Sequence, residues 1–166
     1  MVDVSGSMLA TASGNTSCQD VSVSLGLYLA DKNKGVFKDT FLTFSSNPEL
    51  VTLRGNLLQK LHQMNRAEWG TSTNIIAAFE NVLDVAKSNN VPQSDMPEII
   101  LILSDMQFDC PDNYMTSYQN IVDMYTDSGY TIPKVVFWNL NAAFKNVPVQ
   151  QNTHNVGMVS GFSPSI

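Results

Sequence analysis

The chain has 166 residues, of which 43% are hydrophobic and 14% charged, and its formal net charge is −6. That length and apolar content suit one globular domain, residues 1–166, and exclude a chain that is disordered throughout. No run of Lys or Arg forms a basic stripe that could bind a nucleic-acid backbone. No apolar stretch approaches the ~20 residues of a membrane span. We therefore expect neither direct nucleic-acid binding nor membrane insertion from this segment.

The chain begins with very little sequence before its first polar motif. A buried strand normally runs about five or six residues, whereas only Met1 and Val2 precede Asp3. We expect the first strand to be truncated here, which leaves room for an N-terminal domain outside this chain. Cys18 and Cys110 do not make a disulfide framework, and nothing resembles a signal peptide, so we expect an intracellular, cytoplasmic protein.

The first half of the chain predicts two helices and a hairpin. Apolar residues at helical spacing predict the first helix on Val21, Leu25, Tyr28 and Leu29. Residues 37–45 predict a strand, and residues 49–53 its hairpin partner across Asn47-Pro48. A shorter helix follows, with an apolar face predicted on Leu57, Leu58, Leu61 and Met64.

The second half alternates helices with apolar runs. Residues 99–103 are continuously apolar, as in a strand buried on both faces, and residues 135–138 repeat the pattern. Residues 156–160 predict a short last strand after a polar loop at 139–155. Two more helices are expected, one before residue 99 on Ile75, Phe79, Val82, Leu83 and Ala86, and one between the first two of these strands on Tyr118, Ile121, Val122 and Tyr125. The alternation predicts an α/β fold with a doubly wound, mostly parallel sheet, helices on both faces and one antiparallel edge strand.

Three polar clusters lie where such a fold places its ligands, beyond the carboxyl ends of the strands. They are Asp3-Val4-Ser5-Gly6-Ser7, Gly70-Thr71-Ser72-Thr73-Asn74 and Leu103-Ser104-Asp105. Alternate residues of a strand-end loop point the same way, so one carboxylate and two hydroxyls can converge. Oxygen ligands of this kind suit Mg²⁺, Mn²⁺ or Ca²⁺ and do not suit Zn²⁺.

On these three clusters, in this order, the chain resembles a von Willebrand factor A (vWA) domain with a metal-ion-dependent adhesion site. It is most similar to intracellular members, including the vWA half of Ro/TROVE-like proteins and an uncharacterised family with a vWA-like C-terminal half. The resemblance implies a metal bound by the hydroxyls of Ser5, Ser7 and a threonine, with Asp3 and Asp105 acting mainly through water. Thr73 fits the family pattern better than Thr71, which stays the alternative. Met106 stands where many members have glycine.

The resemblance implies a binding module in which Mg²⁺ or Mn²⁺ coordinates an Asp or Glu carboxylate of a partner protein. A second possibility is the scaffold half of a ribonucleoprotein-type protein. A third is a phosphatase of the haloacid-dehalogenase type, but that chemistry needs a second carboxylic acid two residues after the nucleophile, where this chain has Ser5. Without the other clusters, Asp-x-Ser-x-Ser is also the pattern of an ordinary helix-capping loop. We expect that the protein is not an enzyme.

Overall fold

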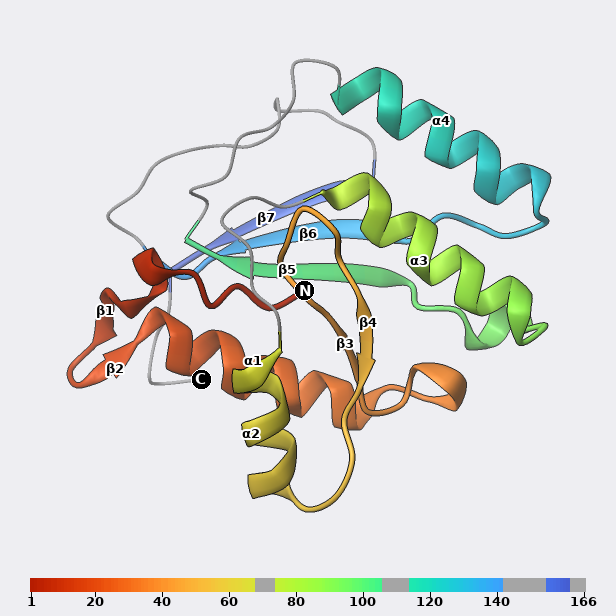
Figure 1. Ribbon diagram of the computed structural model, residues 1–166. Helices are drawn as coiled ribbons and strands as arrows, with labels where there is room; N and C mark the ends of the chain where they lie inside the picture. Colours follow the sequence, from red (N-terminus) through yellow and green to blue (C-terminus); the bar gives the residue numbers. More distant parts are fainter. Residues whose placement is uncertain (68–73, 106–113, 142–154, 162–166) are drawn as a thin grey trace.

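The computed structural model of the protein describes residues 1–67, 74–105, 114–141 and 155–161 (Figure 1). It combines helices and strands in an α/β arrangement. Three parallel strands pair side by side in the order β5 (Ile99–Ser104), β6 (Lys134–Asn139) and β7 (Val156–Ser160). These strands coincide with the apolar runs in the second half of the sequence, which confirms that part of the prediction.

A separate antiparallel hairpin is formed by β3 (Thr40–Leu42) and β4 (Leu50–Thr52). Val2 lies between this hairpin and β5, with parallel bridges to Thr43 on one side and Leu103 on the other. The Val2 N–H donates to the carbonyl of Leu42 at 3.3 Å, and the Asp3 N–H donates to that of Leu103 at 2.9 Å. The first residues of the chain therefore join the hairpin to the parallel strands.

The predicted strand at 37–45 is too long. Residues Gly35–Phe37 form a short 3-10 helix, η2, and Asp39 has a φ of 57°. A left-handed residue cannot continue an extended strand, so β3 starts only at Thr40. The hairpin pairing itself is confirmed, because Thr40 faces Thr52 and Leu42 faces Leu50.

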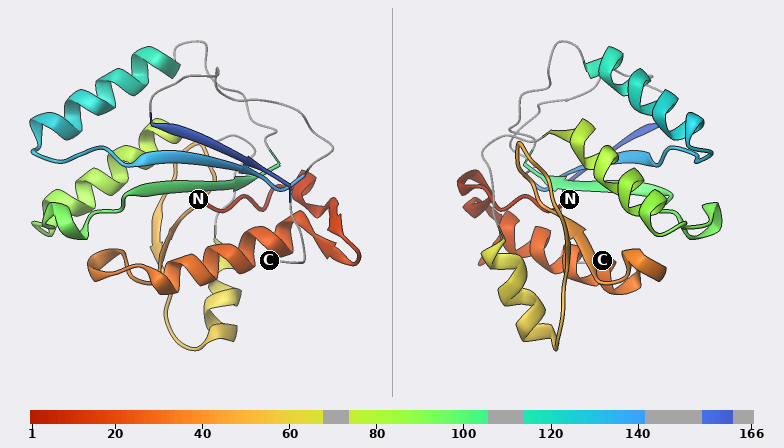
Figure 2. Two further views of the ribbon diagram at one scale, coloured as in Figure 1. Left: turned by 180° about the vertical axis from the view of Figure 1, so that it is seen from behind. Right: turned by 45° about the vertical axis from the view of Figure 1, so that its right-hand side comes forward.

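Helices cover both faces of the strands (Figures 1 and 2). On one face lie α3 (Ile75–Ser88) and α4 (Tyr114–Asp127), and on the other α1 (Cys18–Lys32) and α2 (Leu57–Arg66). Side chains of β5 alternate between the two cores: Ile100 and Ile102 pack with α3 and α4, whereas Leu101 and Leu103 pack with α1 and α2. This alternation follows from the period of two in a strand.

The apolar face predicted for α3 is confirmed, because all five of its residues are buried. On α4, Tyr125 is fully buried and its hydroxyl donates to the carbonyl of Phe79 at 2.9 Å. The two rings meet edge to face, with their centroids 6.2 Å apart. Gly129, with a φ of 78°, follows the end of the helix.

The face predicted for α1 is partly wrong. Val21 is buried, but Tyr28 is 60% exposed, and the residues turned to the sheet are small: Cys18, Ser22, Gly26 and Ala30. A side chain on Gly26 would collide with Val2. Small residues at i, i+4, i+8 and i+12 let this helix lie close to the sheet, and a search for large apolar residues misses such a face.

On α2 the expected helix is present, but its predicted apolar face is only half right, because Leu61 and Met64 pack on the core and the other two leucines do not. Met64 is fully buried, whereas Leu57 is 72% and Leu58 is 60% exposed. The helix starts with a capping box in which the Asn56 side chain accepts the N–H of Gln59 at 3.0 Å. Only one side of this short helix therefore reaches the core, and two leucines lie on the surface.

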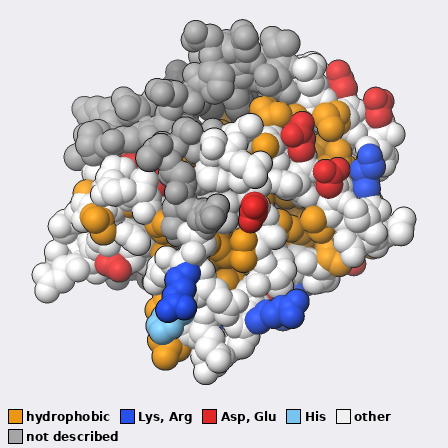
Figure 3. Space-filling view, in the orientation of Figure 1, with side chains coloured by type: hydrophobic (Ala, Val, Ile, Leu, Met, Phe, Trp, Pro, Cys, Tyr) orange, Lys and Arg blue, Asp and Glu red, His pale blue; other side chains and the backbone are white. Residues whose placement is uncertain are grey.

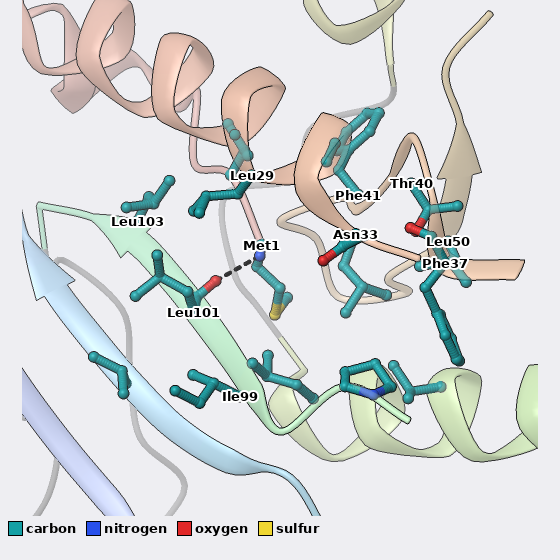
Figure 4. Close-up of a pocket in the computed structure, with 18 of the residues that line it drawn as sticks. Met1, Leu29, Asn33, Phe37, Thr40, Phe41, Leu50, Ile99, Leu101 and Leu103 are labelled. Atoms are coloured by element: carbon teal, nitrogen blue, oxygen red, sulfur yellow. Dashed lines mark hydrogen bonds between the residues drawn. The ribbon is translucent and has the colours of Figure 1, made fainter. Parts of the chain in front are cut away.

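An apolar cavity of about 420 Å³ lies between α1, β3 and β5 (Figure 4). Met1, Leu29, Phe37 and Leu101 are among the residues that line it. None of the described helices is long and apolar enough to cross a membrane.

Candidate metal centre

Asp3 and Asp105 lie at the carboxyl ends of neighbouring extended segments. Asp3 follows Val2, and Asp105 directly follows β5. Because Val2 and Leu103 pair in parallel, both carboxylates emerge at the same edge. Asp3 is 2% and Asp105 0% exposed. The structure thus brings together the two aspartates that the sequence predicted from separate motifs.

The Asp3 carboxylate is held by two donors. Its Oδ1 accepts the N–H of Ser5 at 2.8 Å, and its Oδ2 accepts the hydroxyl of Ser104 at 2.6 Å. Burial raises the pKa of Asp3 above its usual value, the bonds from Ser104 and Ser5 oppose that rise, and the nearby charge of Asp105 adds to it. A buried carboxylate of raised pKa beside a second one is a place where a cation would stabilise the ionised form.

Ser5 and Ser7 place their hydroxyls side by side. The two Oγ atoms are 3.0 Å apart, and both residues are half-buried. Ser5 precedes the 3-10 helix η1 (Gly6–Leu9), yet its side chain makes no capping hydrogen bond. The pattern is therefore not a hydroxyl-capped helix start. Asp3, in contrast, does accept a local backbone N–H, as in a polar turn.

The donor set fits Mg²⁺ in its chemistry, and the separation of its two serine hydroxyls fits as well. Mg²⁺ binds oxygens in an octahedron at about 2.1 Å, so neighbouring ligand oxygens lie about 3.0 Å apart. The two serine hydroxyls have that separation, which is also a normal hydrogen-bond length. The described residues contain no group of three or more His, Cys, Asp or Glu that could hold a metal. A site here would depend on hydroxyls as well as carboxylates.

The threonine of the predicted site cannot be placed, because Thr71 and Thr73 lie outside the described residues, as does Met106. Asn74, the next residue, is described. Its N–H donates to the carbonyl of Ser45 at 3.0 Å, and its side chain accepts the N–H of Ala77 at the start of α3. The start of α3 is thus tied to the segment that follows β3.

Several buried polar residues at the same edge were absent from the predicted site. Ser104, Asn139 and Asn141 are each less than a tenth exposed. Ser104 pairs with Asn139 across β5 and β6, and the Asn141 N–H donates to Asn139 Oδ1 at 2.9 Å. The available signal was that Ser104 and Asn139 each end an apolar run.

Cys18 lies near this edge, at the start of α1. Its thiol donates to the carbonyl of Leu140 at 3.4 Å. Burial raises the pKa of the thiol, and the charge of Asp105 raises it further. The thiol therefore stays protonated at neutral pH. Cys18 is a free cysteine, and Cys110 lies outside the described residues.

The apolar cavity and the polar edge are lined by different residues. Asp3, Ser5, Ser7 and Asp105 are not among its lining residues. The convergent polar groups and this apolar cavity are thus two different features. The chemistry that the polar edge offers is the binding of a hard cation.

Comparison with solved structures gives no match. The chain is 34% identical, over 171 aligned positions, to a protein described as uncharacterized protein L728 of Acanthamoeba polyphaga mimivirus. The match covers 100% of this chain but only 29% of the viral protein. A family model described as a domain of unknown function, DUF7788, matches residues 1–166. The chain therefore belongs to the DUF7788 family.

Proposed function

We propose that this domain is a divalent-metal-dependent protein-binding module. The observation that carries the proposal is the meeting of Asp3 and Asp105 at one edge, with the hydroxyls of Ser5 and Ser7 side by side after Asp3. The metal would be held by Ser5, Ser7, Asp3, Asp105 and the threonine at position 73, as the resemblance to vWA domains implies. Mg²⁺ is the proposed ion, with Mn²⁺ or Ca²⁺ as substitutes.

The same proposal includes a doubly wound fold of the vWA type. Its support is the path from the hairpin through Val2 to β5, β6 and β7, with two helices on each face. In that fold β4 is the antiparallel edge strand. The carboxyl edge then lies where open α/β sheets bind ligands.

The chemistry proposed for the site is coordination without catalysis. A metal held largely by neutral hydroxyls keeps enough positive charge to attract a carboxylate from outside. An Asp or Glu of a partner protein would therefore complete its coordination, in an intracellular, cytoplasmic setting. Nucleic acid is not the proposed ligand, because the chain is acidic overall.

Isothermal titration calorimetry with MgCl₂ and MnCl₂ tests the metal site. We expect saturable binding to the wild type and loss of the signal in Ser5→Ala/Ser7→Ala. Ser24→Ala, an exposed serine on α1, is the matched control and should bind like the wild type. Equal binding by the double variant and the wild type would exclude these hydroxyls as ligands.

Water-proton relaxation with Mn²⁺ tests the open coordination position. Bound Mn²⁺ that keeps exchangeable water should enhance relaxation, and added acetate should reduce that enhancement by displacing the water. A Mn²⁺ complex that acetate does not alter would contradict the partner-carboxylate proposal. Turnover of p-nitrophenyl phosphate, lost in Asp3→Asn, would contradict the absence of catalysis.

A further inference from the structure

The exposed side of α2 carries apolar and cationic residues in one stripe. Leu58, His62 and Arg66 are spaced at i, i+4 and i+8, so they lie next to one another along the helix. All three are exposed. In Figure 3, cationic, histidine and hydrophobic side chains meet at the lower end of the molecule, where Figure 1 places α2.

A hollow of about 400 Å³ lies beside this stripe. It is lined by Arg54, Gly55, Gln59, His62, Gln63 and Arg66. The backbone of Arg54 is fixed against the helix, because its N–H donates to Gln63 Oε1 at 3.0 Å and its carbonyl accepts from Gln63 Nε2 at 2.6 Å. Arg54 and Arg66 therefore border the same hollow from two different elements.

The charge of this hollow is opposite to that of the chain. Arg54 and Arg66 are the only arginines in a sequence with 15 acidic residues and a net charge of −6. Among the described residues, no acidic side chain lines the hollow. Within the described residues neither arginine forms an ion pair, whereas Lys60 on the same helix pairs with Asp39. Both arginines are exposed, so an outside anion can reach them.

Two leucines on α2 are exposed on the surface. Helical spacing predicted Leu57 and Leu58 in the core, yet they are 72% and 60% exposed. Large exposed apolar residues beside a polar rim are typical of protein interaction sites. Arginine is the cation best suited to such a site, because its planar group binds a carboxylate through two hydrogen bonds.

We propose that the surface formed by Arg54, Leu58, His62 and Arg66 docks an acidic segment of a partner protein. Carboxylates of the segment contact the two arginines, and an apolar residue beside them packs on Leu58. A protein segment fits better than a nucleic acid, because a long polyanion would be repelled by the rest of the acidic chain. This surface uses none of the proposed metal ligands and therefore works without metal.

Fluorescence anisotropy tests the proposal on the whole chain in EDTA, where the metal site is inactive. The probe is a fluorescein-labelled peptide that alternates glutamate with leucine, and its control has glutamine in place of every glutamate. Arg54→Gln/Arg66→Gln should weaken binding of the acidic peptide about tenfold, the factor expected for two exposed ion pairs together. Leu58→Gln should weaken it too.

Lys34→Gln/Lys134→Gln is the matched control. It removes two exposed cations elsewhere and therefore has the same net charge as the double arginine variant. It should bind like the wild type. The proposal is overturned if both double variants weaken binding equally, if the glutamine peptide binds as well as the acidic one, or if no binding occurs. Tighter binding of a single-stranded oligonucleotide than of the acidic peptide would assign the surface to nucleic acid. Circular dichroism of each variant confirms that α2 is intact.

Discussion

At the scale of single residues, Ser104 contacts Asp3, one of the proposed metal ligands. Its hydroxyl donates to Asp3 Oδ2 at 2.6 Å, and this bond lowers the pKa of Asp3 against the effect of burial. Ser104→Ala should therefore weaken Mg²⁺ binding about tenfold, as expected when a residue that orients a ligand is removed. Calorimetry at neutral pH measures the change.

Ser22→Ala is the control for that prediction. Ser22 is a fully buried serine whose hydroxyl donates to the carbonyl of Leu103 at 3.3 Å, whereas the hydrogen bonds to the Asp3 carboxylate come from Ser5 and Ser104. Its loss should leave the Mg²⁺ affinity within about twofold of the wild type. Equal losses in both variants would mean that packing, and not the bond to Asp3, controls the affinity.

The residues of the candidate site differ in whether the sequence around them predicts their role. Asp3, Ser5 and Ser7 were predictable because they form one contiguous motif, and Asp105 because it ends an apolar run. Ser104 ends the same run, but its bond to Asp3 was not predictable, because it joins residues 101 positions apart. A sequence pattern indicates the end of each strand, but only the pairing of strands decides which ends meet.

At the scale of elements, the start of α1 depends on a capping box. The Ser17 hydroxyl donates to Asp20 Oδ2 at 2.7 Å, and Ser17 Oγ accepts the Asp20 N–H at 3.1 Å. Ser17→Ala should lower the free energy of unfolding by about 1 kcal/mol at pH 7. Urea denaturation measures this loss of stability. Ser24→Ala, on the exposed side of the same helix, should lower the free energy of unfolding by less.

The same cap predicts a pH dependence. The hydrogen bonds from Ser17 lower the pKa of Asp20 below its usual 3.8, so the folded state binds fewer protons than the unfolded state in that range. The contribution is present above pH 3.8 and is lost as the pH falls through the lowered pKa. The difference between wild type and Ser17→Ala should therefore shrink in acid. A difference that stays constant from pH 6 to pH 2 would argue against the charged cap.

Gly26 tests the close approach of α1 to the sheet. In an exposed helix, Gly→Ala stabilises by about 0.5–1 kcal/mol. Here the added Cβ would collide with Val2 and lie 3.5 Å from the Met64 Cε. We expect Gly26→Ala to destabilise the protein by about 1–3 kcal/mol in urea denaturation. Gly157→Ala on β7 is the control, because its nearest contact, at 3.5 Å, is an ordinary one.

Elements whose signal is local periodicity, such as α3 and β5, were predicted well. The small-residue face of α1 and the exposed leucines of α2 were not, because periodicity records spacing and not how closely a neighbour approaches. The short strands β1 (Thr11–Ser13) and β2 (Thr16–Ser17) were missed as well. They pair with each other across a turn that contains Gly14, whose φ is 56°. Strands this short contain too few residues to show an apolar pattern in the sequence.

At the scale of the whole molecule, the candidate metal centre joins segments that are distant in the sequence. Asp3 and Asp105 come from opposite sides of the Val2–Leu103 pairing, and unfolding would separate them. A cation that binds only the folded chain should therefore stabilise the entire domain. At Mg²⁺ a hundredfold above its dissociation constant, the free energy of unfolding should rise by about 2.7 kcal/mol.

Urea denaturation with MgCl₂ measures this gain, and the acidic composition requires a particular control. With a net charge of −6, the chain is also stabilised by any salt that screens its self-repulsion. KCl at equal ionic strength supplies that general effect alone. The wild type should gain more from MgCl₂ than from KCl, and Ser5→Ala/Ser7→Ala should gain equally from both. If the wild type also gains equally, Mg²⁺ acts on this protein only as a screening ion, because specific binding would add to screening and would depend on the two hydroxyls.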